Sequence, residues 1–211
     1  MPLIQYSVQA SIIDITKDTP KSTDCFLVDT NVWFWTTYTR ASNIPTANNP
    51  KQYQITDYPN YINKAISAGS RLYRSGLNLS ELSHIIEKKE LEIFQLSNPA
   101  VKPKEFRHNF PSERALAVNE IEGSWNMIKN MSEHRDIAID DTKCCNLIQM
   151  LKGVCIDGYD AFFSIHEQMQ NPNFCIITDD GDFSTIPNIF VFTSNKSVIK
   201  TARNKGKLIG R

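Results

Sequence analysis

The sequence lacks the features that mark several large classes of protein. It contains 23 basic and 23 acidic residues, so its formal net charge is 0 and the whole chain has no general attraction for nucleic acid. Its five cysteines include no C-x-x-C pair, which argues against a disulfide framework and a cysteine-based zinc site. It shows no basic leader and no apolar run as long as a membrane span. We therefore expect a cytoplasmic protein with no membrane partner.

Common signatures of phosphate chemistry are absent as well. The sequence contains no G-x-x-x-x-G-K-[ST] and no G-x-G-x-x-G, which excludes P-loop and dinucleotide-binding proteins. A phosphatase of the haloacid-dehalogenase type needs a second aspartate two residues after its nucleophile, and after Asp29 that position is Asn31. A receiver-type phospho-acceptor is excluded too, because Asp24 lies on the wrong side of the predicted strand. Any phosphate chemistry must come from another kind of site.

The most informative stretch that is present ends at Asp29. The residues from Cys25 to Val28 form an apolar run without alternation, and the run stops at this acid. Such a run is too short for a helix and suits a strand that is buried on both faces of a parallel sheet. In open α/β sheets the functional crevice lies just beyond the carboxyl ends of the strands. Asp29 is therefore expected at the edge of such a crevice.

Strand-like and helix-like segments alternate along the rest of the chain. Residues 3–15 alternate polar and apolar positions, which predicts a half-exposed strand at the edge of the sheet. Further strands are expected at residues 25–28, 77–80, 136–140, 174–178 and 189–193, and helices at residues 31–38, 59–73, 81–91, 111–131, 142–151, 161–170 and 197–203. This order predicts an α/β fold, a three-layer α/β/α sandwich around a mainly parallel sheet of about five strands plus the edge strand.

The chain divides into three parts by its sequence pattern. Residues 1–24 are expected to form an N-terminal extension, residues 25–195 the main domain, and residues 196–211 a basic helix and tail. Residues 39–60 and 97–111 hold several prolines and mostly polar residues, so we expect them to be inserts in loop conformation. The helical residues expected to face the core include Leu116, Val118, Ile121, Trp125, Ile128, Leu147, Ile148 and Leu151.

Acidic residues fall where the predicted strands end or the following helices begin. They are Asp29, Glu81, Asp157 or Asp160, and the run Asp179-Asp180-Gly181-Asp182. If these ends line one crevice, the carboxylates repel one another and raise one another's pKa. A divalent cation would offset the repulsion, and oxygen ligands without His or Cys suit Mg²⁺ or Mn²⁺. One or two such ions can activate water for phosphodiester cleavage.

Four motifs at these ends together resemble one known family. They are F-L-V-D-T-N-V-W, the S-G-L-N-L-S that precedes Glu81, Y-D-A-F-F-S-I-H and I-T-D-D-G-D-F. Their order and spacing resemble a PIN domain, a family of metal-dependent ribonucleases that includes the VapC-type toxins of bacterial toxin–antitoxin pairs. The resemblance implies that residues 25–195 form a PIN-like nuclease that hydrolyses RNA with Mg²⁺ or Mn²⁺. It also makes a protein inhibitor, the antitoxin, and a homodimer candidate partners.

The resemblance also implies roles for individual residues. The implied catalytic metal ligands are Asp29, Glu81, Asp160 and Asp180, with Asp182 as a supporting acid. The residues that would surround them and supply hydrogen bonds are Thr30, Asn31, Thr178 and Asp179. Contact with RNA is possible for His84, one helical turn after Glu81, and for the indoles of Trp33 and Trp35. Packing within the protein explains each of these side chains as well.

Each acidic position also has an ordinary explanation. Asp29 and Asp157 could cap the helices that follow them, and Glu81 could be a solvated acid in the first turn of a helix. The run from Asp179 to Asp182 could be a simple acidic turn, since it lacks the ligand spacing and closing Glu of an EF-hand. The second functional hypothesis is therefore a catalytically silent PIN-fold module that binds RNA or a protein partner. Metal binding by the acids separates the two hypotheses.

Overall fold

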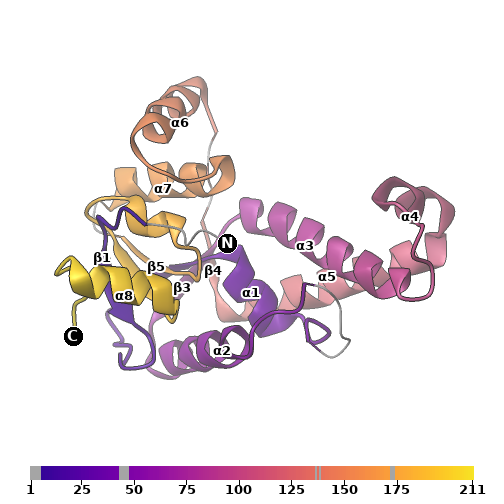
Figure 1. Ribbon diagram of the computed structural model, residues 1–211, viewed down its shortest axis with the longest axis horizontal. Helices are drawn as coiled ribbons and strands as arrows, with labels where there is room; N and C mark the ends of the chain where they lie inside the picture. The colour runs from indigo at the N-terminus through magenta and orange to yellow at the C-terminus, as the bar shows by residue number, and fades with distance from the viewer. Residues whose placement is uncertain (1–5, 43–47, 136, 138, 172–173) are drawn as a thin grey trace.

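A parallel β-sheet forms the centre of the protein (Figure 1). The structure, a computed structural model, describes residues 6–42, 48–135, 137, 139–171 and 174–211. Over these residues the sheet has six strands, in the order β1 (Ser11–Asp14), β6 (Phe190–Thr193), β5 (Cys175–Ile177), β2 (Cys25–Val28), β3 (Arg71–Arg74) and β4 (Glu133–His134). Each strand pairs in parallel with its neighbours. Helices cover both faces of the sheet, so the predicted α/β fold is confirmed.

From β2 onward, helices lie between the successive strands and after the last one. They are α1 (Thr30–Thr37), α2 (Gln52–Ser67), α3 (Gly76–Gln95), α4 (Pro103–Asn109), α5 (Pro111–Met131), α6 (Asp141–Gly153), α7 (Gly158–Gln170), the short 3₁₀ helix η1 (Asp182–Thr185) and α8 (Lys196–Asn204). In the described part of the chain, no helix combines the length and the apolar character that a membrane crossing requires.

The alternation of side chains along β2 divides the core in two. Phe26 and Val28 pack with residues of α1, α2, α3 and α5, whereas Leu27 packs with residues of α7 and α8 on the other face. All three side chains are buried. Because both faces of the sheet are covered, β2 must be apolar along its whole length, which is the pattern of its sequence. The first acid, Asp29, comes where the strand ends.

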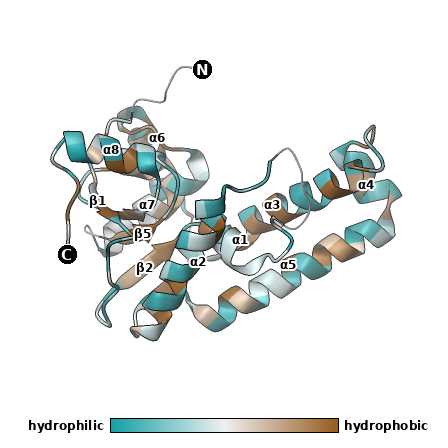
Figure 2. Ribbon diagram, turned by 60° about the horizontal axis from the view of Figure 1, so that its bottom comes forward, coloured by the Kyte–Doolittle hydropathy of each residue, from teal (hydrophilic) through white to brown (hydrophobic). Residues whose placement is uncertain are grey.

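Helices α3 and α5 lie side by side and extend away from the sheet, with α4 at their far end (Figures 1 and 2). Leu91, Phe106 and Ala117 form a separate small core there. The 97–111 segment, which was predicted to be a loop, therefore contains α4. This helix begins with Pro103, whose missing N–H and fixed φ suit the first position of a helix.

Several residues predicted to face the core are exposed, with relative exposures of 41–53%: Leu116, Val118, Ile148 and Leu151. The first two lie on α5, which packs against α1, α3 and α4 and buries Ala117, Ser124 and Ile128 instead. The other two lie on α6, which packs on α7 and has no buried residue among those that the structure describes. Periodicity predicted both helices correctly, but burial depends on which neighbours a helix has.

The start of α3 also differs from the prediction. The expected strand at residues 77–80 is the first turn of this helix, and the strand β3 comes earlier. The helix begins here because Ser75 caps it: its hydroxyl accepts from the backbone N–H of Leu77 at 3.1 Å, and Asn78 Oδ1 accepts from the backbone N–H of Ser75 at 2.8 Å. Glu81 therefore lies in the second turn of α3 instead of at its start.

Further segments depart from expectation, among them residues 71–73, which were expected at the end of a helix and belong to β3. Helix α2 begins at Gln52, inside the 39–60 segment that was predicted to be a loop. The strand predicted at residues 136–140 is not present at the described positions among them, and residues 136 and 138 lie outside the described residues. The corresponding strand, β4, comes just before and pairs with β3.

The guanidinium group of Arg211 joins distant parts of the chain. Its nitrogens donate to Asp18 at 2.8 and 2.9 Å and to both oxygens of Asp24 at 2.8 Å. Its Cζ lies 4.5 Å from the centroid of the Phe192 ring. Asp18 and Asp24 belong to the segment that leads into β2. Arg211 therefore helps to fix the strand whose end carries Asp29.

Replacing Arg211 by alanine is expected to lower the free energy of unfolding by about 3 kcal/mol. The buried Asp18 carboxylate would keep the Tyr61 hydroxyl as a partner but lose its counter-charge. Urea unfolding followed by circular dichroism measures the change. The matched control is Arg203→Ala, because Arg203 is exposed and has no side-chain bond to the described residues; a loss below about 0.5 kcal/mol is expected there. Equal losses would contradict this role of Arg211.

Candidate active site

Asp29 lies at the point where β2 ends and α1 begins. Its Oδ2 accepts a hydrogen bond from the Thr178 hydroxyl at 2.6 Å, and its Oδ1 accepts from the backbone N–H of Asn31 at 3.4 Å. Only 6% of the residue is exposed. Asp29 thus caps α1, but the cap bond is long, and the short bond goes to Thr178. A capping role alone leaves the bond to Thr178 unexplained.

Thr178 connects Asp29 to the acidic turn that follows β5. Its hydroxyl oxygen also accepts from the backbone N–H of Asp180 at 2.9 Å. Oδ1 of Asp180 in turn accepts from the backbone N–H of Asp182 at 2.8 Å. These bonds fix the acidic turn against the end of β2 and place Asp180 near Asp29.

Asp179 is bound by side chains of α2. Tyr53 and Gln54 donate to its Oδ2 at 2.9 and 2.7 Å, and Tyr58 donates to its Oδ1 at 2.7 Å. The side-chain amide of Asn195 donates to its backbone carbonyl at 2.8 Å. Because four groups hold this one residue, it anchors the turn that carries Asp180. The sequence predicts that Asp179 supplies hydrogen bonds around the acids. In the structure its carboxylate accepts hydrogen bonds from α2.

Glu81 reaches the same edge of the sheet from α3. The start of α3 is tied to α1, because Asn78 Nδ2 donates to the Thr30 hydroxyl at 2.9 Å and both residues are buried. Oε2 of Glu81 is buried and has no hydrogen-bond partner among the described residues. Such an atom is uncommon in folded proteins, because nothing compensates its loss of water. A bound cation would compensate it.

Asp160 comes from the first turn of α7. Oδ1 of Asp157 caps this helix, accepting from the backbone N–H groups of Tyr159 and Asp160 at 3.0 and 3.1 Å. Asp160 itself is 9% exposed. Together with Asp29 it lines an internal cavity of about 10 Å³, which is close to the volume that one water molecule needs. The two residues therefore border a space of about the size of one water molecule.

Burial and mutual repulsion raise the pKa values of these two acids. Burial raises the pKa of Asp29; the Thr178 hydrogen bond opposes this, and the charges of Glu81 and Asp180 add to it. Burial likewise raises the pKa of Asp160, and the charge of Asp29 adds to it. Without a cation, the pair therefore keeps a proton at a pH at which exposed carboxyl groups have lost theirs.

The same causes act on the other acids. Burial raises the pKa of Glu81, and the charges of Asp157 and Asp180 add to this effect while a Thr30 hydrogen bond opposes it. Burial also raises the pKa values of Asp180 and Asp182, and in both cases the charge of Asp157 contributes. Asp157 has the capping role expected for it, and its carboxylate also belongs electrostatically to the site.

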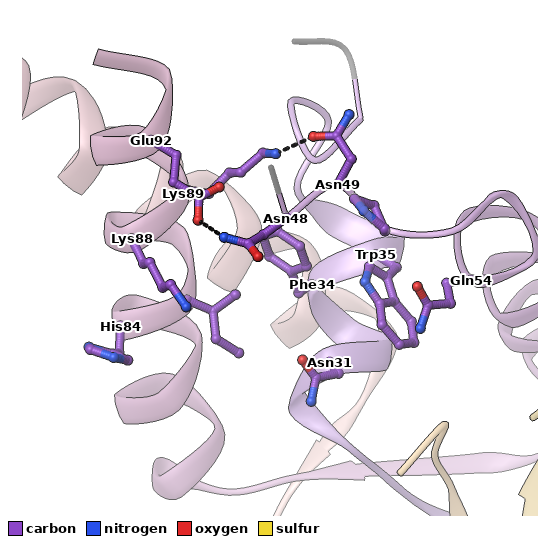
Figure 3. A pocket seen from close by; sticks show the side chains of 12 residues that line it. Asn31, Phe34, Trp35, Asn48, Asn49, Gln54, His84, Lys88, Lys89 and Glu92 are labelled. Atoms are coloured by element: carbon purple, nitrogen blue, oxygen red, sulfur yellow. Dashed lines mark hydrogen bonds between the residues drawn. The ribbon is translucent and has the colours of Figure 1, made fainter. Parts of the chain in front are cut away.

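The structure brings the predicted acids to one edge of the sheet, and we call them the acid cluster: Asp29, Glu81, Asp160, Asp180 and Asp182. Of the predicted surrounding residues, Thr30 and Thr178 bond within this region. Asn31 bonds to Asp29 through its backbone N–H, whereas its side chain lines a neighbouring pocket (Figure 3). Within the described ranges, no three His, Cys, Asp or Glu side chains already form a ligating arrangement. A cation would have to draw the carboxylates closer together.

Sequence reasoning missed Tyr6 and Asn78. The ring of Tyr6 packs so closely on Gly181 that a Cβ atom there would overlap it. Burial raises the pKa of the Tyr6 hydroxyl, and the charges of Asp180, Asp182 and Asp179 add to this, so the N-terminal segment reaches the acidic turn. The glycine inside D-D-G-D was the available signal for a close approach, and the Ser75-x-x-Asn78 spacing was the signal for the cap.

Comparison with known proteins adds a likeness of shape. No family model matches the sequence, and no curated protein matches it. One similar solved structure is the VapBC2 complex from Rickettsia felis bound to a DNA fragment from its promoter. A chain of that complex is 16% identical, with a TM-score of 0.44, over 80% of this chain and 98% of that chain. A likeness of this extent carries no information about activity.

The raised pKa values predict how stability depends on pH without metal. In the folded state these acids bind protons more readily than in the unfolded chain. Their stabilising contribution is therefore complete below the unfolded pKa of about 4 and is lost as the pH rises through the folded values. In EDTA, the melting temperature should fall as the pH rises from about 4 through the folded pKa of about 7 for Asp29 and about 10 for Asp160, at roughly 2–4 °C per kcal/mol of lost stability. Asp29→Asn should flatten this profile, and a melting temperature that rises with pH would contradict the assignment.

Gly181→Ala is expected to destabilise the protein by about 1–3 kcal/mol, because the added methyl group overlaps the Tyr6 ring. The backbone of Gly181 has φ −72° and ψ −19°, which alanine adopts freely, so the contact alone is tested. Thermal unfolding of both single variants and the Gly181→Ala/Tyr6→Ala double variant measures the coupling. Removing the ring should recover most of the loss; an undiminished loss would show that another contact is responsible.

Proposed function

We propose that the protein is a metal-dependent endoribonuclease of the PIN type, which hydrolyses phosphodiester bonds in single-stranded RNA. The observation that supports this most is the acid cluster. Separate segments of the chain converge there, and burial and mutual repulsion raise the pKa values of its members. Buried carboxylates without counter-charges destabilise a fold. Their convergence therefore favours a site that accepts positive charge.

The donor set fits a hard divalent cation. The groups available are all carboxylate oxygens, which suit Mg²⁺ or Mn²⁺ better than softer metals. The residues that would hold the ion are Asp29, Glu81, Asp160 and Asp180, with Asp182 in support. Oε2 of Glu81, which is buried and has no partner among the described residues, is the atom that a cation would compensate most. A cation bound here would supply the Lewis-acid chemistry that assists phosphodiester hydrolysis.

The chain's own residues orient the site and control its protons. Thr178 orients Asp29 through a hydrogen bond of 2.6 Å, and α2 holds the acidic turn through Asp179. Asp160 keeps its proton in the metal-free protein, because burial and the charge of Asp29 raise its pKa. It gives up that proton when positive charge is bound. Metal binding should therefore release protons and weaken at low pH.

The choice of RNA over DNA comes from the resemblance of the four motifs to the PIN family. The resemblance also supports two finer proposals. One is a role as the toxin of a toxin–antitoxin pair, with a protein inhibitor as partner, and the other is a homodimer. In this proposal the scissile phosphate lies against the acid cluster, and water attacks the phosphorus in line with the leaving oxygen.

One observation favours the second hypothesis, a catalytically silent module that binds RNA or a protein. The acids do not stand in a ligating arrangement within the described part of the chain. A module without catalysis would have no need to draw them together. Metal binding therefore decides between the two functions before any substrate is known.

Asp29→Asn is expected to lower metal-dependent cleavage of a mixed single-stranded RNA pool by at least about 100-fold. The amide oxygen can still accept a hydrogen bond from the Thr178 hydroxyl. Because one repelling charge is also lost, the melting temperature of the metal-free protein should stay the same or rise. Cleavage is measured with Mn²⁺, Mg²⁺ or EDTA, and Mn²⁺ binding by calorimetry. A large fall in the melting temperature would make Asp29 structural instead.

Glu81→Gln and Glu122→Gln provide a matched comparison. Both replace a carboxylate by an amide on a helix, but Glu122 is exposed on α5 and away from the acid cluster. Glu81→Gln should weaken Mn²⁺ binding, and Glu122→Gln should not. No Mn²⁺ binding and no cleavage by the unaltered protein would overturn the enzyme and favour the silent module. Mn²⁺ binding without cleavage would support the metal site and contradict RNA as the substrate.

A further inference from the structure

A pocket of about 550 Å³ lies beside the acid cluster, within the size range of ligand-binding sites. Helix α1, helix α3 and residues 48–50 line it, together with Gln54 from α2 (Figure 3). Asn31 lies two residues after Asp29, and His84 lies three residues after Glu81. The pocket therefore begins where the acid cluster ends. The proposed metal site does not account for this pocket.

Polar side chains hold the far end of the pocket together. Lys89 Nζ donates to Asn49 Oδ1 at 2.6 Å, and Asn48 Nδ2 donates to Glu92 Oε1 at 2.6 Å. These two bonds, drawn in Figure 3, join residues 48–50 to α3. They also engage Glu92, the acid among the described residues that line the pocket. These hydrogen bonds fix this wall of the pocket in place, and the Glu92 carboxylate already accepts one of them.

Helix α3 presents a cation to the pocket. Glu81, His84 and Lys88 follow one another at spacings of three and four residues, so they share one face of the helix. His84 and Lys88 are exposed, and both line the pocket (Figure 3). Lys88 Nζ makes no hydrogen bond or ion pair with the described residues. A phosphate bound by Lys88 would lie on the path that leads along α3 to Glu81.

Helix α1 presents an aromatic ring. Trp35 is half-buried, and its ring centroid lies 5.4 Å from that of Tyr58 at an interplanar angle of 41°. Tyr58 is itself fixed by its hydrogen bond to Asp179. The indole is therefore held in place relative to the acidic turn, and it also lines the pocket. A fixed indole is a stacking partner for an unpaired base.

Asn31 adds a polar edge to the same wall. Its side-chain amide lines the pocket between α1 and α3 (Figure 3) and has no hydrogen-bond partner within the described residues. An amide offers both a donor and an acceptor, which is what recognition of a base edge requires. Cation, aromatic ring and amide thus line one pocket beside the acid cluster.

We infer that this pocket binds one nucleotide of single-stranded RNA, next to the phosphodiester bond that is cut. Its phosphate would bind Lys88, its base would stack on Trp35, and Asn31 would contact the base edge. The inference rests on the proposed function, because that function makes the acid cluster the point of cleavage. Single-stranded RNA is required, because a base inside a duplex has no free face to offer to the indole.

Binding is measured in the Asp29→Asn background with EDTA, so that neither cleavage nor metal contributes. A fluorescein-labelled single-stranded RNA of eight nucleotides is titrated by anisotropy at several salt concentrations. Trp35→Ala should weaken binding by about 10-fold. Lys88→Ala should lower the slope of log Kd against log salt by about 0.7, the value for one phosphate contact on a single strand. The matched control Lys104→Ala, exposed on the distant α4, should change neither.

The outcomes separate this inference from the function on which it rests. Metal-dependent cleavage by the unaltered protein, with binding unchanged in Trp35→Ala and Lys88→Ala, would overturn the pocket and leave the ribonuclease. Binding that depends on both residues without any cleavage would support the pocket and overturn the ribonuclease. Equal binding of the matching duplex, or no binding of the single strand, would overturn the inference. If Trp35→Ala does not fold, Lys88→Ala against Lys104→Ala decides alone.

Discussion

The edge of the sheet is governed by one physical constraint: acids that repel one another are buried side by side. Asp29 is positioned by the end of β2 and Asp160 by the first turn of α7, so the backbone brings the two acids to the same edge. The Thr178 hydroxyl and the retained protons reduce the repulsion in the metal-free protein. A bound cation would displace the retained protons and attract the carboxylates. The electrostatics of the acid cluster therefore favour a metal site.

Helix α2 links this constraint to the rest of the molecule. Its Tyr58 bonds to Asp179 in the acidic turn and also packs against Trp35 in the neighbouring pocket. One side chain therefore supports both the residues proposed to cut RNA and the surface proposed to bind it. Because α2 begins inside the segment expected to be a loop, that segment contributes to the site through its helical half. A change in α2 would therefore affect both the position of the acidic turn and the shape of the neighbouring pocket.

The sequence predicted local structure well where one strong local pattern dominated. The apolar run before Asp29 predicted a buried strand, and the caps and periodicity of residues 111–131 predicted α5 at its observed bounds. The prediction failed where two local signals competed. The short apolar pattern at residues 77–80 suggested a strand, but the cap formed by Ser75 and Asn78 makes it the first turn of a helix. Leu116 was misplaced for a different reason, because periodicity cannot show how many neighbours a helix has.

By itself, the sequence determined the alternation of strands and helices, the apolar centre of the sheet and the acids at its carboxyl edge. These follow from hydrophobic burial and from the geometry of parallel strands, which act over a few residues or apply to every sheet of this kind. Only the tertiary structure decided that Tyr53 holds Asp179, 126 residues away, that Tyr6 covers Gly181, and that Asn31 turns toward the pocket. Such contacts join segments whose separation in the sequence carries no pattern, so they arise only when the packed layers bring the side chains together.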